Sequence, residues 1–263
     1  MKKVMLTVTM LILTGCIAQK AKETKIIAHR GAHIVAPENT VEAIEKANDL
    51  GYSGVEIDVR TSKDGINFLM HDDTLDRTTN GSGEEEKLTI KELKDLEIKT
   101  AGYPDYKNEV LKIPTFEEAV ESIAKTKLEV NIDGSKGNWA DEKFVYSIMQ
   151  TLKKYKVYNR SFFVLSDKKI RDSVVKCYPD ATVSWLYDSK NNIDDEIKQV
   201  KSYEKSLLSI SNSQADKEML NKLNQAQINY QVYGVNDNER FLELQKQSVP
   251  IIETDKIDPT KVN

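Results

Sequence analysis

Cysteine is scarce in this chain: its 263 residues include only two, Cys16 and Cys177. So few cysteines exclude a disulfide-stapled scaffold, and stability must instead come from a large apolar core, which a chain of this length can supply. The sequence also contains no repeat, no low-complexity segment and no Gly-, Ser- or Pro-rich linker. Nothing in it divides residues 25–263 into separate domains.

An excess of positive charge is also missing. Lys and Arg total 38 against 42 Asp and Glu, a net charge of −4. Without residues 1–15 and their two lysines the balance becomes 36 − 42 = −6. A mildly acidic protein is not built to coat nucleic acid or anionic lipid, so no nucleic-acid partner is expected.

The N-terminal stretch MKKVMLTVTMLILTGC has two lysines and an apolar run too short to span a bilayer comfortably, which is typical of an export leader. Its end, LTGC at 13–16, resembles the lipobox of bacterial lipoproteins, whose cysteine is diacylated. The resemblance implies a signal peptide over 1–15, a lipidated tether over 16–24, and an exported, extracytoplasmic protein held to a bacterial membrane at Cys16. The alternative is an ordinary signal peptide. If Cys16 carries lipid, Cys177 has no other cysteine to pair with, and we expect it to be a buried small side chain at a helix end rather than a nucleophile.

Short β-branched runs alternate with amphipathic stretches along the rest of the chain, which is typical of a parallel sheet with crossover helices. The predicted strands lie at 25–29, 54–59, 128–133, 161–165, 182–186, 206–210, 230–235 and 250–253. The predicted helices lie at 40–50, 115–125, 141–155, 167–177, 193–203, 214–227 and 236–247. Eight strands in a chain of this size favour closure into a (β/α)8 TIM barrel.

One connection is too long for an ordinary barrel loop. Residues 70–114 are polar and punctuated by glycine, with one short helix at about 89–96. Long connections after a barrel strand lie at the active-site face, so we expect a small inserted subdomain or lid, about 72–113, after the second strand.

Two carboxylates stand two residues apart on a predicted strand, in GVEIDVR. Glu56 and Asp58 therefore point to the same face. Adjacent carboxylates raise each other's pKa unless a cation lies between them. The pair is either a site for a hard cation such as Ca²⁺ or Mg²⁺, or the solvated acidic face of an edge strand.

Two of the three histidines stand at the ends of short apolar runs. His29 and Arg30 follow the first strand, and His71 follows residues 67–70. Because strand ends converge in a barrel, these side chains would share one mouth with the carboxylate pair. Arginine and a cation neutralise phosphate oxygens, while one imidazole takes a proton from the attacking oxygen and the other protonates the leaving oxygen. Two histidines, an arginine and a cation site together are therefore suited to binding and hydrolysing a phosphodiester.

The motifs HRG, PENT, VEIDV, KDG and HDDTLDRTTNGSG, in this order over residues 26–83, resemble the glycerophosphodiester phosphodiesterase family. Weaker similarities, in IPTFEEAV, GVNDN and the terminal TD, run to the end of the chain. The resemblance implies a (β/α)8 barrel with a small insertion, one divalent cation, and hydrolysis of small glycerophosphodiesters to glycerol 3-phosphate and an alcohol. The attacking group is either water or the glycerol 2-hydroxyl by way of a cyclic phosphate.

The resemblance also assigns roles to residues. It makes His29 and His71 the acid–base pair, Arg30 a phosphate ligand, and Glu56 and Asp58 metal ligands. The family's third ligand is the Glu of a Glu-x-Lys pattern after the third strand, where this chain reads LEVNIDGSKG. Asp133 takes the place of that Glu, with a carboxylate one methylene shorter.

The lysine of that pattern is displaced. Lys136 stands three residues after Asp133 rather than two, and Ser135 occupies the formal lysine position. Either a bulge at Gly134 restores Lys136 as a phosphate contact, or Lys136 lies in the loop after the strand.

Two aromatic residues are candidate substrate contacts. Tyr233 stands where the family has the Trp of a Trp-Thr-Val-Asn motif, and Trp185 lies at the end of the fifth strand. Each either lines the pocket, facing a cationic alcohol such as choline, or packs in the core.

The PENT motif has two readings. Glu38 either holds His29 or Arg30 in place or belongs to a turn before a helix, and Asn39 or Thr40 is expected to be the N-cap of that helix. His33 is expected to be a loop residue.

Two other functions stay open. A lysophospholipase D-like hydrolase would show an open apolar groove at the mouth. A non-catalytic binding lipoprotein on the same barrel has only the altered third-strand motif in its favour. No pattern in the sequence predicts an oligomeric state or the alcohol released.

Overall fold

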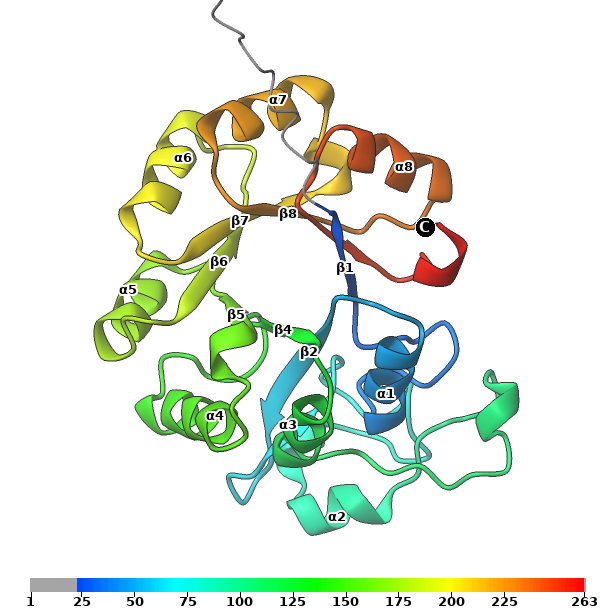
Figure 1. The fold of residues 1–263 in the computed structure, drawn as a ribbon. Coiled ribbons are helices and arrows are strands. Elements are labelled where there is room, and N and C mark those ends of the chain that lie inside the picture. The colour runs from blue at the N-terminus through cyan, green and yellow to red at the C-terminus, as the bar shows by residue number, and fades with distance from the viewer. Residues whose placement is uncertain (1–22, 263) are drawn as a thin grey trace, which may run out of the picture.

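A closed barrel of parallel strands forms the centre of the protein. The computed structural model describes residues 23–262, so the predicted leader and Cys16 lie outside the described residues. Within 23–262, eight parallel strands form a ring that closes where β1 pairs with β2 (Figure 1). Their bounds are β1 Lys25–Ala28, β2 Gly54–Thr61, β4 Glu129–Asp133, β5 Ser161–Val164, β6 Thr182–Leu186, β7 Ser206–Ser211, β8 Tyr230–Tyr233 and β9 Ile251–Thr254.

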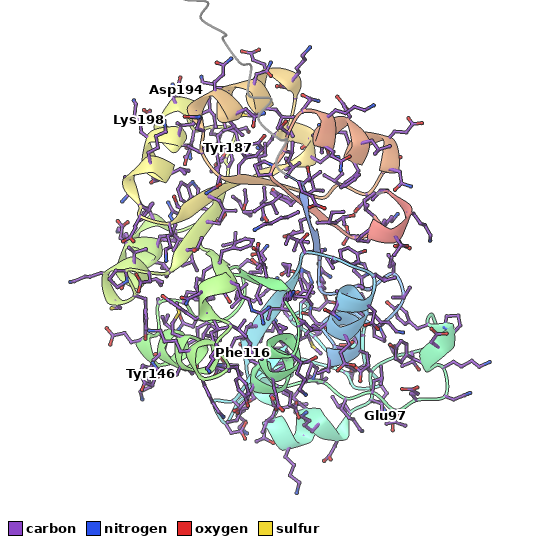
Figure 2. The ribbon with its side chains drawn as sticks, in the orientation of Figure 1. Glu97, Phe116, Tyr146, Tyr187, Asp194 and Lys198 are labelled. Carbon is purple, nitrogen blue, oxygen red and sulfur yellow. The ribbon has the colours of Figure 1, made fainter. Side chains whose placement is uncertain are left out.

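Helices surround this ring (Figure 1). Their bounds are α1 Val41–Asp49, α3 Phe116–Ala124, α4 Glu142–Lys154, α5 Lys168–Cys177, α6 Ile193–Ser202, α7 Lys217–Ala226 and α8 Asn238–Lys246. Tyr146 of α4 and Asp194 and Lys198 of α6 lie on the periphery of the molecule (Figure 2). Every predicted strand and helix is present, with ends shifted by a few residues at most, and the predicted (β/α)8 barrel is confirmed.

Polar residues mark where the helices begin. The side chain before each helix accepts a hydrogen bond from a backbone N–H of the first turn, which satisfies one of the donors that a helix start leaves free. These N-caps are Thr40, Thr115, Asp141, Asp167, Asn192, Asp216 and Asp237.

Strand residues alternate between the barrel interior and the helix layer. On β2, Val55, Ile57 and Val59 belong to the main apolar core, and Glu56 and Asp58 point the other way, into the barrel. The interior also holds a small apolar cluster of Phe162, Val164 and Leu207 and a hydrogen-bonded polar set of Asn131, Ser184, Ser209, Gln231 and Glu253. The interior is therefore packed, and its polar part leads to the ends of the strands.

The long connection before α3 forms a small packed unit. Its first strand, β3 (Asn67–Leu69), pairs antiparallel with the end of β2, and its helix is α2 (Ile90–Asp95). It has a separate apolar cluster of Phe68, Met70, Leu75, Leu93 and Ile113. In Figure 1 it lies beside α1 and α3, outside the ring of strands. The predicted insertion is present as a flanking unit rather than as a lid.

Cys177 is free and exposed at the end of α5, so the expectation of a buried side chain is wrong. Cys177 stands on the same side of α5 as Arg171 and Val174, but it is the last residue of the helix and lies at the edge of a groove lined by α4 and α5. Within residues 23–262, no helix is long and apolar enough to cross a membrane.

Candidate active site at the carboxyl ends of the strands

Three carboxylates meet inside one end of the barrel. Glu56 and Asp58 point inward from β2, and Asp133 is the last residue of the neighbouring strand β4. The parallel register pairs Asp58 with Asp133 directly. One oxygen from each of the three side chains lies within 4.8 Å of the other two. The three predicted metal ligands are therefore brought together; we call them the carboxylate cup.

Burial makes the carboxylate cup unfavourable without a positive charge. Glu56 and Asp58 are only 3% and 1% exposed. Burial raises the pKa of Glu56 well above its ordinary value, and the charges of Asp58, Glu253 and Asp133 add to the rise. Burial also raises the pKa of Asp58. Three such oxygens fit Ca²⁺ or Mg²⁺, hard cations that take carboxylate ligands and would supply the missing charge.

Asn39 fixes Asp58 from two sides. Its side-chain nitrogen donates to Oδ2 of Asp58 over 2.7 Å, and its side-chain oxygen accepts the backbone N–H of Asp58 over 3.1 Å. Asn39 has φ = +54°, a left-handed conformation that asparagine tolerates better than most residues. Thr40 is the N-cap of α1, as expected. Of the two candidates for the cap, Thr40 therefore takes that role, and the side chain of Asn39 turns into the site.

His29 faces a carboxylate from the adjacent strand. β1 and β9 pair in parallel register, so His29 and Asp255, one residue beyond each strand, lie opposite each other. Nδ1 of His29 lies 2.6 Å from Oδ1 of Asp255, and Nε2 lies 3.9 Å from Oε2 of Glu56. Burial lowers the pKa of His29, but the hydrogen bond to Asp255 and the charges of Glu253 and Asp255 outweigh burial and raise the pKa overall.

His71 has a carboxylate partner of its own. It follows β3, and its Nδ1 lies 2.8 Å from Oδ1 of Asp72. Arg77 donates to both oxygens of Asp72, over 2.6 and 2.8 Å, and this hydrogen bonding holds the pKa of Asp72 well below its usual range. Asp72 therefore stays a carboxylate beside the ring. His71 lines a small cavity together with Glu38 and Asn39, and Asn39 binds Asp58 of the carboxylate cup.

Arg30 connects the loop after β1 to the carboxylate cup. Its backbone N–H donates to Oε2 of Glu56 over 2.9 Å, and its guanidinium donates to Oε1 of Glu38 over 3.0 Å. Its Nε is buried, lies 3.6 Å from Oδ2 of Asp58, and has no hydrogen-bond partner among residues 23–262. Glu38 also accepts two hydrogen bonds from Arg77. Glu38 therefore holds Arg30, one of the two readings of the PENT motif, and the Nε of Arg30 is a donor suited to an anionic ligand.

Gly31 completes this turn because a side chain does not fit there. It has φ = +79°, and an added Cβ would lie 2.7 Å from the Cβ of Ala43. The close approach of α1 lets the chain turn at once after β1 and aim the N–H of Arg30 at Glu56.

Arg60 ties the inserted unit to the backbone of His71. It follows Asp58 on the same face of β2 and is 7% exposed. Its Nε and Nη2 donate to the carbonyl oxygens of Met70 and His71 over 3.1 and 2.8 Å. Its Nη1 lies 3.0 Å from Oε1 of Glu85, a buried residue of the insertion. Arg60 therefore holds the segment that carries His71 in position.

Replacing Arg60 with methionine is expected to lower the free energy of unfolding by about 3–5 kcal/mol, because Glu85 would be left buried without its cation. Urea unfolding followed by circular dichroism measures the loss, and the double variant R60M/E85Q should recover part of it. Lys198→Met, which removes an exposed pair with Asp195, should cause no measurable change. If Arg60→Met is as stable as the wild type, Arg60 does not hold the inserted unit in place.

Lys136 lies in the loop after β4 rather than in a bulge. Gly134 extends the pairing with β5 by one backbone hydrogen bond, and the chain then turns. Ser135 donates to Asp133 through its backbone N–H, over 2.9 Å, and through its hydroxyl. Of the two readings of LEVNIDGSKG, the loop is the one observed, and Ser135 holds the side chain of Asp133.

Lys136, in the loop after β4, and Tyr233, the last residue of β8, both stand at the carboxyl ends of barrel strands, the end that carries the carboxylate cup. The hydrogen bond from Arg60 and, more weakly, the charge of Lys136 lower the pKa of Asp73. Tyr233 ends β8, half-buried, and burial together with the charge of Glu253 raises its pKa. Both residues remain candidate substrate contacts.

Trp185 does not line the mouth, and its assignment as a substrate contact is corrected. Its neighbour Ser184 points into the barrel and bonds Ser209, so Trp185 points outward into the helix layer. There its Nε1 donates to Glu196 of α6 over 2.6 Å, and its ring lies 4.2 Å from the guanidinium carbon of Arg171. Trp185 is 3% exposed and takes the core-packing role.

Two acidic residues, one in β9 and one directly after it, belong to the site without having been singled out as site residues in the sequence. Glu253 points into the barrel, where Asn131 donates to it over 2.6 Å, and burial raises its pKa. Asp255 is the partner of His29, and the hydrogen bond from His29 holds its pKa far below its usual range. The terminal Thr-Asp dipeptide was the only signal that pointed toward Asp255.

The arrangement is suited to proton transfer at a polyanionic ligand. Each of the two imidazoles has a carboxylate on Nδ1, which fixes the ring and leaves Nε2 for a ligand. Arg30 and the carboxylate cup lie beside them, so a phosphate group bound here would meet positive charge and two proton carriers.

Comparisons with known proteins agree with this chemistry. A family model described as the glycerophosphoryl diester phosphodiesterase family matches residues 29–259. A glycerophosphodiester phosphodiesterase of Caldanaerobacter subterraneus is 33% identical over 165 residues, covering 63% of this chain and 67% of that protein. The human glycerophosphodiester phosphodiesterase 1 is 43% identical over 110 residues, covering 41% of this chain and 32% of that protein.

A solved structure has the same fold over most of both chains. It is that of a phosphodiesterase from Oleispira antarctica in complex with the product sn-glycerol-3-phosphate, with a TM-score of 0.78 and 26% identity. The match covers 91% of this chain and 95% of that one.

Proposed function

This chain belongs to the glycerophosphoryl diester phosphodiesterase family, and we propose from this that it hydrolyses small glycerophosphodiesters to glycerol 3-phosphate and an alcohol. Membership confirms the family resemblance and the enzyme class, a phosphoric diester hydrolase. The observation that carries the proposal is the convergence of the carboxylate cup with Arg30 and two carboxylate-backed imidazoles.

One divalent cation, Ca²⁺ or Mg²⁺, is the cofactor in this proposal. Glu56, Asp58 and Asp133 would hold it, because one carboxylate oxygen from each lies within 4.8 Å of the other two and because Glu56 and Asp58 are buried. When bound, the cation neutralises charge on the phosphate oxygens and orients the diester. Asn39 and Ser135 keep two of the ligands in place through hydrogen bonds.

His29 and His71 carry the protons. Each needs to gain and lose a proton at Nε2 during one turnover, and the carboxylate on Nδ1 stabilises the imidazolium form. Asp255 does this for His29, and Asp72, held by Arg77, does it for His71. Arg30 binds the phosphate through its guanidinium, and Lys136 adds a second positive charge from the loop after β4.

Small, deacylated diesters are the proposed substrates. The side chains that contact the carboxylate cup are charged or polar: His29, Arg30 and Asn39, with Asp255 behind His29. Such a lining favours the glycerol hydroxyls and anionic phosphate oxygens of a water-soluble diester over an acyl chain.

Attachment to a bacterial membrane by lipid at Cys16, with the enzyme outside the cytoplasm, completes the proposal. Its support is the LTGC sequence after a short apolar run with two lysines. Labelling of cells with a clickable fatty acid should mark the wild-type protein and leave the Cys16→Ser variant unmarked. Equal labelling of the two would exclude the anchor.

A coupled assay tests the function directly. Purified protein with glycerophosphocholine should release glycerol 3-phosphate, detected with glycerol 3-phosphate dehydrogenase, and EDTA should stop the release until Ca²⁺ or Mg²⁺ is restored. Faster release from lysophosphatidylcholine would instead indicate a lysophospholipase D-like enzyme. No release from any diester would leave a binding protein on the same barrel.

Tyr233 is expected to affect KM for diesters with a cationic alcohol. Tyr233→Ala removes an aromatic face that attracts a quaternary ammonium group, so KM for glycerophosphocholine should rise by about 3- to 10-fold with kcat little changed, a loss of about 0.5–1.5 kcal/mol. Trp185→Phe is the matched control, because Trp185 lies in the helix layer, and should leave KM unchanged. Equal effects of both variants would contradict the placement of Tyr233.

A further inference from the structure

A third imidazole shares the carboxylate that supports His29. His33 lies in the loop after Gly31, and its Nε2 is 3.1 Å from Oδ1 of Asp255, the same oxygen that lies 2.6 Å from Nδ1 of His29. The two rings are 6.4 Å apart, centre to centre, and nearly perpendicular, with an angle of 71° between their planes. The proposed function gives His33 no part in proton transfer, so its place in this triad is unexplained.

The three side chains have the composition of a transition-metal site. One ligand atom from each of His29, His33 and Asp255 lies within 4.8 Å of the other two. Two imidazole nitrogens and one carboxylate oxygen are a set that binds Zn²⁺, with the fourth tetrahedral position left for water. The three side chains are 25–29% exposed, so an ion can enter from solvent.

A fourth residue already holds the carboxylate in place. Asn236 donates from Nδ2 to Oδ2 of Asp255 over 2.7 Å, and its Oδ1 accepts the backbone N–H of Asp255 over 2.8 Å. The oxygen facing the two rings is therefore Oδ1, while Oδ2 is occupied. Ligands of protein metal sites are commonly oriented by such a second layer of hydrogen bonds.

We propose that His29, His33 and Asp255 form a second metal site, for Zn²⁺ or a similar borderline cation, and that filling it switches the enzyme off. The site differs from the carboxylate cup in donor chemistry: imidazole nitrogen suits zinc, whereas three carboxylates suit Ca²⁺ or Mg²⁺. Millimolar Ca²⁺ or Mg²⁺ should therefore fill the cup without competing for the second site. The inhibitory effect, though not the binding, rests on the proposed acid–base role of His29.

Inhibition follows from the nitrogen that the metal would use. Nδ1 of His29 faces Asp255 and His33, while Nε2 faces Glu56 and the carboxylate cup. Zinc on Nδ1 would occupy its lone pair, so the ring could not carry protons on both nitrogens. The imidazolium form, which acid–base turnover requires, would be unreachable, and Asp255 would be withdrawn from its role as hydrogen-bond acceptor.

Calorimetric titration of the full-length protein with ZnCl₂, in excess Mg²⁺, tests the site. Wild type should bind one Zn²⁺ more tightly than His33→Gln does, by about tenfold or more. Zinc should inhibit release of glycerol 3-phosphate by wild type at concentrations that leave His33→Gln active. Without zinc, the variant should keep activity within about threefold of wild type, because His33 contacts Asp255 and the bond of Asp255 to His29 remains.

Two further variants separate this inference from the proposed function. His71→Ala should lose turnover yet bind Zn²⁺ as the wild type does, because its own partner is Asp72. Asp58→Asn should lose the cup and still bind zinc. Equal zinc affinity of wild type and His33→Gln, or equal inhibition of both, would overturn the site whatever the outcome of the activity measurements.

Discussion

Replacing His29 or His71 with alanine is expected to lower kcat for glycerophosphocholine by about a hundredfold to ten-thousandfold while the barrel stays folded. This range is what one positioned proton carrier contributes to such reactions. Neither ring belongs to the main apolar core, and both are about 30% exposed, so their loss creates no cavity. The coupled assay measures kcat, and circular dichroism with thermal unfolding checks the fold.

The matched control is a histidine of the same loop. His33→Gln removes an imidazole that also contacts Asp255 but lies outside the proton path, so in zinc-free buffer it should retain turnover. The carboxylate partners should have intermediate effects: Asp255→Asn and Asp72→Asn leave the rings in place but weaken the stabilisation of imidazolium. Near-wild-type, EDTA-insensitive activity in His29→Ala or His71→Ala would contradict the assignment.

Much of the fold and part of the site could be predicted because they follow from local periodicity. The alternation of short β-branched runs with amphipathic helices is repeated along the chain and needs no knowledge of tertiary contacts. The convergence of Glu56, Asp58 and Asp133 follows from two facts that sequence carries: residues two apart share a strand face, and parallel strand ends meet at one edge. The roles of these residues stay predictions.

What could not be predicted depends on register and on strand phase. Asp255 meets His29 across 226 residues because β1 and β9 pair in one particular register, and no local pattern encodes that register. Trp185 could not be assigned to one face from the sequence, because a residue near a strand end fits both faces until a neighbour, here Ser184, settles the phase. Arg60 was missed because its partners are backbone oxygens and a glutamate of the insertion.

Glu56→Gln is expected to remove both activity and the stabilisation that Ca²⁺ or Mg²⁺ gives the wild type. A cation at 100 times its Kd stabilises a folded protein by about 2.7 kcal/mol, and in a domain of this size each kcal/mol raises Tm by about 2–4 °C. Glutamine keeps an oxygen to accept the N–H of Arg30, so the loop should stay in place. Activity should fall by about a hundredfold or more, because a ligand to the cation is lost.

Glu56→Gln should also raise the Tm of the cation-free protein. The variant is therefore expected to be more stable than the wild type without the cation and less stable with it, which makes the test specific. Burial and three neighbouring carboxylates disfavour the charge on Glu56, so a neutral side chain relieves a cost that the empty cup imposes on folding. Differential scanning fluorimetry with and without EDTA measures the Tm of both proteins in the two states. Glu129→Gln, which removes a carboxylate paired with Lys25 at the opposite end of the strands, should leave the cation-induced rise in Tm intact. If the wild type shows no such rise, or Glu56→Gln keeps it, the cation is held elsewhere and the three carboxylates serve another purpose.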